Sequence, residues 1–365
     1  MYKQFMSLAL DLAVKGIGSV NPNPLVGAVI VKNNRIIGQG FHERYGDSHA
    51  EINAINSVSE EITGSTLYVT LEPCFHTGKT PPCVDAIIKY NFKKVIIAMT
   101  DPNPLVSGKS IQKLIDNNIE VVTGVLEEES RKINEIFIKF ITTGRPFVTM
   151  KSAMTLDGKI SSVTGASKWI SSEQSRKFTH RLRHRMSAIM VGIGTVLADD
   201  PELTARIEEG RNPIRVVVDS KLRIPLNAKL LKVTKNLKTI IAATNKAEKR
   251  KMQILESMGV GVLIIPDSGG MVNLMELMKE LGKIGVDSIL LEGGGTLNFS
   301  ALEENIIDKV LFFIAPKIIG GYSAKTPVEG VGKKTIGEAY NLVNTNVSTI
   351  GDDVVIEGYI DREGK

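Results

Sequence analysis

Four residues in the first quarter of the sequence are of the types that form a catalytic zinc site. His49 and Glu51 stand in a His-Ala-Glu triplet, Cys74 follows Pro73, and Cys83 is the second of two cysteines. Zinc binds imidazole and thiolate groups well, and a catalytic zinc keeps three protein ligands and one open position for water. We therefore expect His49, Cys74 and Cys83 to bind a zinc ion.

Glu51 is the carboxylate that remains beside these three ligands. Zinc lowers the pKa of bound water toward about 7, and a neighbouring carboxylate can carry protons to a departing amine. This combination is typical of enzymes that remove an exocyclic amine from a nucleobase ring. The pattern therefore predicts a zinc-dependent hydrolytic deaminase with Glu51 as its catalytic residue.

Other interpretations of the same residues remain open. The two cysteines could be buried apolar thiols. His42 or His76 could complete a purely structural, four-ligand zinc site, and a zinc module could bind a nucleotide as a regulator without catalysis. The structural-zinc and regulatory interpretations leave Glu51 without a task.

The spacing of the cysteines separates this chain from the nucleic-acid deaminases. Those enzymes carry the pattern Pro-Cys-x-x-Cys, whereas eight residues, FHTGKTPP, lie between Cys74 and Cys83. The inserted loop places His76 and Lys79 next to the expected metal, where they could hold a phosphorylated substrate. A tRNA deaminase fused to a binding domain is the alternative function, and it would require the short spacing and an extended basic, aromatic groove.

The elements that must position these residues alternate between helices and strands. An amphipathic helix opens the chain, a hairpin follows, and residues 48–58 and 82–90 are expected to form helices on either side of the strand 66–71. Another buried strand comes next, and the run EEESRKINEIFIKFITTG is expected to be helical up to Gly144. Such alternation predicts an α/β layered sandwich for residues 1–145.

The alternation restarts in residues 146–365 and predicts a second α/β domain. Its elements include a basic helix around residues 172–185 and several short apolar strands. The run SILLEGGGTLNF is expected to form a strand, a glycine turn and a helix, which would let backbone N–H groups approach an anionic pyrophosphate. The same turn could serve packing only, and the pair Gly192 and Gly194 lacks the third glycine of the Rossmann fingerprint.

Length, composition and charge limit the class of protein. At 365 residues the chain exceeds what one hydrophobic core usually serves, and 42% hydrophobic and 23% charged residues are typical of a folded globular protein. The net charge of +5 is too diffuse to indicate nucleic acid as the partner. No stretch approaches the roughly 18 apolar residues of a membrane span, and two cysteines close together in sequence favour a reducing cytoplasm.

Several motifs taken together resemble a known family. The runs NPNPLVGAVIV and PCFHTGKTPPC, with the His-Ala-Glu triplet between them, resemble the deaminase half of the bifunctional RibD family of riboflavin biosynthesis. The runs KSAMTLDGKI, SKWIS, VGIGTVLADDPELTAR and EGGGTLNFSAL resemble its reductase half. The resemblance covers almost the whole chain. It implies a cytidine-deaminase-like three-layer sandwich in residues 1–145 and a dihydrofolate-reductase-like, NADPH-dependent domain in residues 146–365.

The resemblance also implies two consecutive reactions. The first is the zinc-dependent hydrolytic deamination of 2,5-diamino-6-(5-phosphoribosylamino)pyrimidin-4(3H)-one to 5-amino-6-(5-phosphoribosylamino)uracil. The second is the NADPH-dependent reduction of the ribose of that product to the ribitylamino compound. We accordingly expect small-molecule substrates, no nucleic-acid or membrane partner, and a homo-oligomer, either a dimer or a tetramer.

Residues at matching positions acquire expected roles from the same resemblance. It places the deaminase substrate at Asn23, His42, His76 and Lys79. It places the reductase substrate at Ser167, Arg183, Leu203, Arg206 and Glu292, with Lys151 as a further candidate at the rim. It places NADPH at Ala153, Trp169, Thr195, Asp199, Ser220, Gly294, Gly295, Thr296, Leu297 and Asn298. Ordinary structural roles remain open, because Asn23 and Asp199 could be turn residues and Trp169 could belong to the core.

Overall fold

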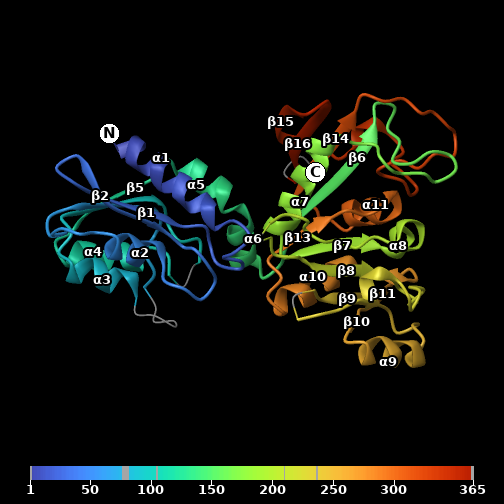
Figure 1. The fold of residues 1–365 in the computed structure, drawn as a ribbon, viewed down its shortest axis with the longest axis horizontal. Helices are drawn as coiled ribbons and strands as arrows, with labels where there is room; N and C mark the ends of the chain where they lie inside the picture. Colours follow the sequence, from blue (N-terminus) through green and yellow to red (C-terminus); the bar gives the residue numbers. More distant parts are fainter. Residues whose placement is uncertain (1, 76–81, 104–105, 209, 236, 363–365) are drawn as a thin grey trace. The chain divides into compact units, whose positions relative to one another are not determined.

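The computed structural model describes residues 2–75, 82–103, 106–208, 210–235 and 237–362. The chain divides into two compact units, residues 1–144 and 145–365, each with its own sheet and hydrophobic core (Figure 1). Within these described ranges, no helix combines the length and the apolar character needed to cross a membrane.

The first unit is built on a five-stranded sheet of order β2-β1-β3-β4-β5. Its strands are β1 (Gly27–Lys32), β2 (Arg35–Phe41), β3 (Thr66–Leu71), β4 (Lys94–Met99) and β5 (Glu120–Thr123). The pairs β1/β2 and β1/β3 are antiparallel, and the pairs β3/β4 and β4/β5 are parallel. The hairpin expected from the sequence is β1–β2, and its turn residues Asn33 and Asn34 both have positive φ, as a tight two-residue turn requires.

Helices cover both faces of this sheet. They are α1 (Tyr2–Ala13), α2 (Ala50–Asn56), α3 (Cys83–Lys89), α4 (Lys109–Asp116), α5 (Glu127–Ile133) and α6 (Glu135–Thr143), with a short 3-10 helix at Val14–Gly16. One face packs against apolar residues of α1, and the other packs against α2, α3 and α4. The first unit is therefore the three-layer sandwich that the sequence predicted.

Two details of this unit depend on close packing that the sequence did not reveal. A Cβ on Gly27 of β1 would lie 1.9 Å from the carbonyl oxygen of Ala9, so only glycine lets α1 approach this strand. The run expected to be one helix is divided into α5 and α6 at Asn134. The Asn134 side chain is buried and exchanges hydrogen bonds with the backbone of Leu25, accepting from its N–H at 2.8 Å and donating to its C=O at 3.0 Å.

The second unit is built on a nine-stranded sheet of order β10-β9-β8-β7-β13-β6-β14-β16-β15. Its strands are β6 (Phe147–Thr155), β7 (Ala188–Gly192), β8 (Ile214–Val218), β9 (Thr239–Ala243), β10 (Gly261–Ile264), β13 (Ser288–Leu291), β14 (Lys309–Ala315), β15 (Leu342–Ile350) and β16 (Asp353–Ile360). The seven strands from β10 to β14 in this order are mutually parallel. Strand β16 pairs antiparallel with β14, and β15 pairs antiparallel with β16. A small ribbon joins β11 (Asp267–Ser268) and β12 (Met271–Val272).

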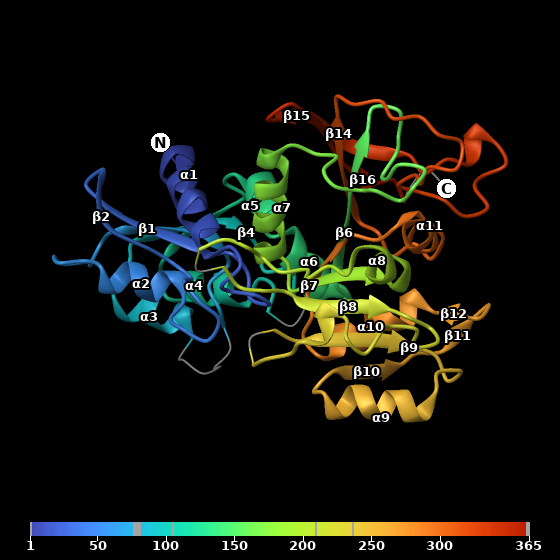
Figure 2. The ribbon, with the colours of Figure 1, turned by 45° about the vertical axis from the view of Figure 1, so that its right-hand side comes forward.

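Helices also cover both faces of the second sheet. They are α7 (Glu173–Arg185), α8 (Ile193–Asp199), α9 (Lys249–Ser257), α10 (Leu274–Lys283) and α11 (Gly295–Glu303), with 3-10 turns at Lys229–Leu231 and Ile336–Glu338. The helices α10 and α11 pack on one face, whereas α8 and α9 pack on the other, with α9 beside the edge strand β10 (Figure 2). This is the dihydrofolate-reductase-like α/β architecture expected from the resemblance.

The parallel strands β7 and β13 are neighbours, although about a hundred residues separate them in the sequence. Each of these strands leads directly into the start of a helix, α8 after β7 and α11 after the glycine turn that follows β13. The carboxyl ends of parallel strands are where α/β proteins bind ligands. Both helix starts therefore open at the same edge of the sheet.

Candidate active sites

The expected zinc ligands meet at the starts of two helices in the first unit. His49 is the N-terminal cap of α2, Cys83 is the first residue of α3, and Cys74 lies in the loop after β3. The Nδ1 atom of His49 lies 3.5 Å from Cys74 Sγ and 3.3 Å from Cys83 Sγ, and all three ligand atoms lie within 4.8 Å of one another. Tetrahedral zinc with bonds of about 2.1 and 2.3 Å would separate nitrogen from sulfur by about 3.6 Å. The donor set and its spacing fit zinc.

The groups around Cys74 favour the thiolate form that a metal needs, whereas hydrogen bonding to Cys74 raises the pKa of Cys83. The N–H of Cys83 donates to Cys74 Sγ at 3.2 Å. Hydrogen bonding by the Cys83 thiol, followed in effect by that of His49, lowers the pKa of Cys74 to about 4. Cys74 therefore carries a negative charge at neutral pH.

Glu51 lies in the first turn of α2, only 3% exposed. Burial, and next to it the negative charge of Cys74, raises the pKa of Glu51 to about 7. A carboxyl group with a pKa near neutrality both accepts and releases protons readily. The position and the chemistry of Glu51 match the role of a proton carrier.

Two of the residues expected to bind the deaminase substrate lie beside the ligand His49. The ring of His42 packs edge-on against that of His49 at 5.5 Å between centroids, and its Nε2 lies 3.1 Å from Asn23 Nδ2. Burial lowers the pKa of His42, so the ring is neutral, and Nδ1 can donate to the Ser48 carbonyl oxygen at 3.1 Å. The other two expected residues, His76 and Lys79, lie outside the described residues.

Glu72 is a buried carboxylate near this site that sequence reasoning missed. Its Oε2 accepts from the N–H groups of Asp101 (3.1 Å) and Gly108 (3.0 Å), and its Oε1 accepts from Ser110 N–H (3.1 Å). These bonds join the loop that carries Cys74 to the loop after β4. A carboxylate directly after a buried strand was the available signal, but its partners lie about thirty residues away in sequence.

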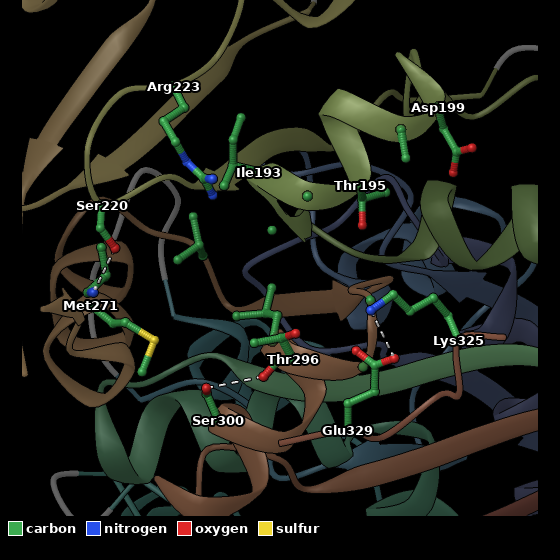
Figure 3. Close-up of a pocket in the computed structure, with 18 of the residues that line it drawn as sticks. Ile193, Thr195, Asp199, Ser220, Arg223, Met271, Thr296, Ser300, Lys325 and Glu329 are labelled. Carbon is green, nitrogen blue, oxygen red and sulfur yellow. Dashed lines mark hydrogen bonds and ion pairs between the residues drawn. The ribbon is translucent and has the colours of Figure 1, made fainter. Parts of the chain in front are cut away.

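The second unit contains a cavity of about 750 Å³ at the carboxyl ends of its parallel strands. The starts of α8 and α11 form its middle, where Gly194 and Gly294 face open space or only ordinary contacts. The first N–H groups of a helix have no partner within the helix, and such a start binds phosphate groups well. Figure 3 shows Ile193 and Thr195 of α8 opposite Thr296 of α11. A dinucleotide such as NADPH fits a cavity of this size and lining.

Most of the residues expected to bind NADPH line this cavity. They are Thr195, Asp199, Ser220 and Gly294 to Leu297. Asn298 is fully buried, and its Nδ2 donates to the carbonyl oxygens of Gly293 at 3.3 Å and Pro327 at 2.8 Å, so its side chain supports the glycine turn. Trp169 is largely exposed with the Arg176 guanidinium 4.5 Å from its ring centroid, and Ala153 lies half-buried in β6. Cofactor contacts by all of the expected residues stay predictions, and these last three lie outside the lining of the cavity.

A charged cluster brings together three of the residues expected to bind the reductase substrate. Arg183 of α7 donates from Nε and Nη2 to the two carboxylate oxygens of Glu292, each at 2.9 Å. Burial alone would raise the pKa of Glu292, but the charges of Arg183 and Lys151 lower it to about 2. Burial lowers the pKa of Lys151, and the charge of Arg183 adds to this effect. Among the described residues, Lys151 Nζ has no hydrogen-bond partner, although it lies 5.3 Å from the Phe313 ring centroid.

The other expected substrate residues of this unit lie on two segments. Ser167 lines the cavity, and its Oγ donates to Asp199 Oδ1 at 3.1 Å. Leu203 is buried with a positive φ of 54°. Arg206 forms an exposed ion pair with Glu202 at 3.3 Å. Arg183 Nη1 also donates to the carbonyl oxygen of Thr204 at 3.1 Å, which ties the segment after α8 to the charged cluster.

Comparisons with known proteins identify relatives of both units. Residues 1–99 match the cytidine and deoxycytidylate deaminase zinc-binding region, and residues 146–356 match the RibD C-terminal domain. The chain is 46% identical to the riboflavin biosynthesis protein RibD of Actinobacillus pleuropneumoniae, over 97% of this chain and 94% of that protein. It is 45% identical to RibD of Aquifex aeolicus, over 97% of both chains.

Solved structures match along the same length. The fold is similar to that of Acinetobacter baumannii RibD, with a TM-score of 0.89, 36% identity and 99% of both chains covered. It is also similar to a diaminohydroxyphosphoribosylaminopyrimidine deaminase/5-amino-6-(5-phosphoribosylamino)uracil reductase of Thermotoga maritima, with a TM-score of 0.85, 38% identity and 99% of both chains covered. The chain therefore belongs to the RibD family of bifunctional deaminase and reductase enzymes of riboflavin biosynthesis.

Proposed function

We propose that residues 1–145 deaminate 2,5-diamino-6-(5-phosphoribosylamino)pyrimidin-4(3H)-one and that residues 146–365 reduce the resulting 5-amino-6-(5-phosphoribosylamino)uracil with NADPH. The observation that carries this proposal is the presence of two chemically different sites in two compact units. The first unit holds a His-Cys-Cys cluster beside a buried glutamate. The second holds a dinucleotide-sized cavity next to an Arg-Glu-Lys cluster.

In the first unit, the metal site and Glu51 divide the chemistry of deamination. Zinc, when it is held by His49, Cys74 and Cys83, activates water for attack near neutral pH. Glu51 takes up a proton from that water and gives it to the pyrimidine ring. It then takes the proton of the added hydroxyl group, which becomes the carbonyl, and gives it to the leaving amine, which departs as ammonia. Asn23 and His42 bind the substrate beside the metal, because the His42 ring packs against the ligand His49 and lies within 3.1 Å of the Asn23 amide.

In the second unit, the charged cluster receives the ribose of the deaminated product. NADPH, when bound, supplies the hydride that reduces C1 of the opened ribose. In the opened ribose C1 is doubly bonded to the amino nitrogen, so the accompanying proton goes to that nitrogen. Lys151 is the residue suited to give this proton, because its pKa is lowered and its amine has no hydrogen-bond partner among the described residues. The Arg183–Glu292 pair is largely buried, whereas Arg206 and its partner Glu202 are exposed, and an exposed ion pair is weak. Arg206 is therefore better suited than Arg183 to the substrate phosphate.

Separate assays of the two reactions test this proposal. Purified full-length protein receives the diaminopyrimidine substrate, and ammonia release and NADPH absorbance are followed independently. We expect ammonia to be released without NADPH, and NADPH to be oxidised once the deaminated product is present. The absence of both signals would contradict the assignment.

We also infer that the protein is a cytoplasmic homo-oligomer that binds small molecules and no nucleic acid. The edge strand β15 supports self-association, because most of its residues are exposed and Val343 and Val347 place apolar surface there. The two cysteines form no disulfide with each other, as in a reducing compartment. Light scattering of the purified protein during size-exclusion chromatography tests the assembly, and a monomeric mass would contradict it.

A further inference from the structure

The segment that follows α8 carries two of the residues expected to bind the reductase substrate. It spans residues 201–206, contains no helix or strand, and includes Leu203 and Arg206. Leu203 and Ala205 are buried, whereas Arg206 is exposed, so the segment lies against the domain with the Arg206 side chain at the surface. Because no strand pairing holds this backbone, other groups must fix it.

Helix α7 supplies groups that fix the backbone of this segment. Phe178 and Leu182 of the helix pack against apolar residues of β14 and β16, which anchors α7 on the sheet. His180 and Arg183, which lie one turn apart on the same helix, contact the segment. Arg183 Nη1 donates to the carbonyl oxygen of Thr204 at 3.1 Å. The segment is therefore attached to a helix that is itself held in place.

The His180 Nδ1 atom lies between two backbone groups that make opposite demands on it. It is 3.3 Å from the Arg206 nitrogen and 3.2 Å from the Thr204 carbonyl oxygen. That carbonyl already accepts from Arg183, whereas the Arg206 N–H has no other acceptor among the residues that the structure describes. Burial, and next to it the charge of Arg183, lowers the pKa of His180, so the ring is neutral near pH 7. A neutral ring that carries its proton on Nε2 accepts from the Arg206 N–H through Nδ1.

The charges around His180 connect it to the substrate cluster. Glu292 accepts both carboxylate hydrogen bonds from Arg183 and thereby fixes the guanidinium group that holds the segment. Among the described residues, the Arg206 guanidinium pairs only with the exposed Glu202, and such a pair is weak enough to exchange for another anion. Arg206 therefore combines a fixed backbone with a charged group that is available to a ligand.

We propose that His180 is a positioning residue of the reductase, because its Nδ1 holds the Arg206 backbone and so directs the Arg206 guanidinium toward the phosphate of the substrate. This inference rests on the function proposed above, in which Arg206 binds that phosphate. A group that is already in place before the substrate arrives binds it more tightly, because less conformational freedom is lost. Loss of the His180 acceptor should therefore weaken substrate binding and leave hydride transfer almost unchanged.

Two substitutions of His180 separate its hydrogen bond from the volume of its ring. Asparagine carries Oδ1 on Cγ, where histidine carries Nδ1, and can accept from the same N–H, whereas leucine fills space without an acceptor. NADPH oxidation on the deaminated substrate measures the reductase, and ribose 5-phosphate serves as an inhibitor that lacks the pyrimidine. We expect His180→Leu to raise the KM of the substrate and the inhibition constant of ribose 5-phosphate about 3- to 10-fold at similar kcat, as for one lost hydrogen bond. His180→Asn should return both constants to within about twofold of the wild type, because the acceptor is restored.

His184 offers a matched control on the same helix. It lies one turn after His180, and its Nδ1 accepts from the Arg211 N–H at 2.9 Å, outside the residues expected to bind substrate. His184→Leu removes a hydrogen bond of the same kind, so it should lower the melting temperature about as much as His180→Leu without changing the KM. If both leucine variants raise the KM equally, general loosening of the contacts of α7 explains the effect and the inference is wrong.

A double substitution connects the effect to Arg206. Arg206→Ala should raise the same two constants by more than His180→Leu does, and adding His180→Leu to it should cause no further rise. If the two rises multiply, or if Arg206→Ala has no effect, the inference is wrong although the reductase assignment stands. If the wild-type protein does not oxidise NADPH on the deaminated substrate, the proposed function is itself wrong.

Discussion

The two active sites of this protein are built in different ways. In the first unit, side chains supply the chemistry: His49, Cys74 and Cys83 bring three ligand atoms within 4.8 Å of one another. In the second unit, backbone at the starts of α8 and α11 supplies much of the cavity, and the charged side chains come from distant strands. A side-chain site can be recognised from residue types and order, whereas a backbone site requires the fold.

The largest expected effect comes from a substitution that disrupts the zinc site of the first unit and leaves the second unit intact. Cys83→Ala removes one of three zinc ligands, so the metal should be lost and ammonia release should fall below detection. NADPH oxidation on the deaminated substrate should continue at the wild-type rate, because the second unit has its own sheet and core. Zinc content by elemental analysis and the two assays check this. Loss of both activities in a protein that keeps its circular dichroism spectrum would show that the sites are not independent.

A smaller effect separates the metal from the proton carrier within the first site. Glu51→Gln keeps the shape of the side chain but cannot transfer protons, so ammonia release should fall about 10²- to 10⁴-fold. Zinc content should stay at the wild-type level, because Glu51 is not a ligand. If zinc is lost together with activity, Glu51 belongs to the metal site itself, and its role as proton carrier would be wrong.

The third prediction concerns pH and the second site. The lowered pKa of Lys151 means that its ammonium loses the proton below the ordinary lysine value of 10.5. If protonated Lys151 serves the reaction, reductase kcat/KM should fall as the pH rises through that lowered pKa. Lys151→Met should lower kcat about 10²-fold and abolish this alkaline limb. If the Lys151→Met variant shows the same fall in kcat/KM at high pH, a group other than Lys151 causes that fall.

The sequence predicted the features that depend on neighbouring residues and missed those that depend on contacts between distant residues. The zinc ligands, Glu51 and the β1–β2 hairpin follow from local residue types, because turn preferences and ligand chemistry act over short distances. The break between α5 and α6 at Asn134 could not be foreseen, since its partner Leu25 lies 109 residues away. Strand β15 was also missed, because nearly all of its residues are exposed and it shows no buried face.

The cofactor cavity shows more clearly that contacts between residues far apart in the sequence could not be predicted. The glycine turn after β13 was recognisable, but the insertion of β13 between β6 and β7 was not, and that insertion brings the two helix starts together. The pair Arg183–Glu292 joins residues 109 positions apart. Only the resemblance to a family placed them in one site before the fold was known.

The smallest expected effect distinguishes backbone that binds cofactor from backbone that only packs. Gly294 and Gly295 are adjacent, but a Cβ on Gly295 would lie 2.4 Å from Glu329 Cγ and 2.6 Å from Thr326 O, whereas a Cβ on Gly294 meets only Thr195 Oγ1 at 3.7 Å. Gly295→Ala should therefore reduce the free energy of unfolding by about 1–3 kcal/mol, as overpacking does. Gly294→Ala should leave that free energy nearly unchanged and still weaken NADPH, because its new methyl group occupies space that the pyrophosphate needs.

Thermal unfolding and titration of NADPH fluorescence measure the two quantities separately for each variant. If Gly294→Ala binds NADPH as tightly as the wild type, the turn after β13 serves packing only. The cofactor would then have to be held by side chains, and the contrast between the two sites would disappear. If both variants lose stability equally, the open space at Gly294 is not available in solution. The proposal that backbone of this glycine turn binds the pyrophosphate would then also be wrong.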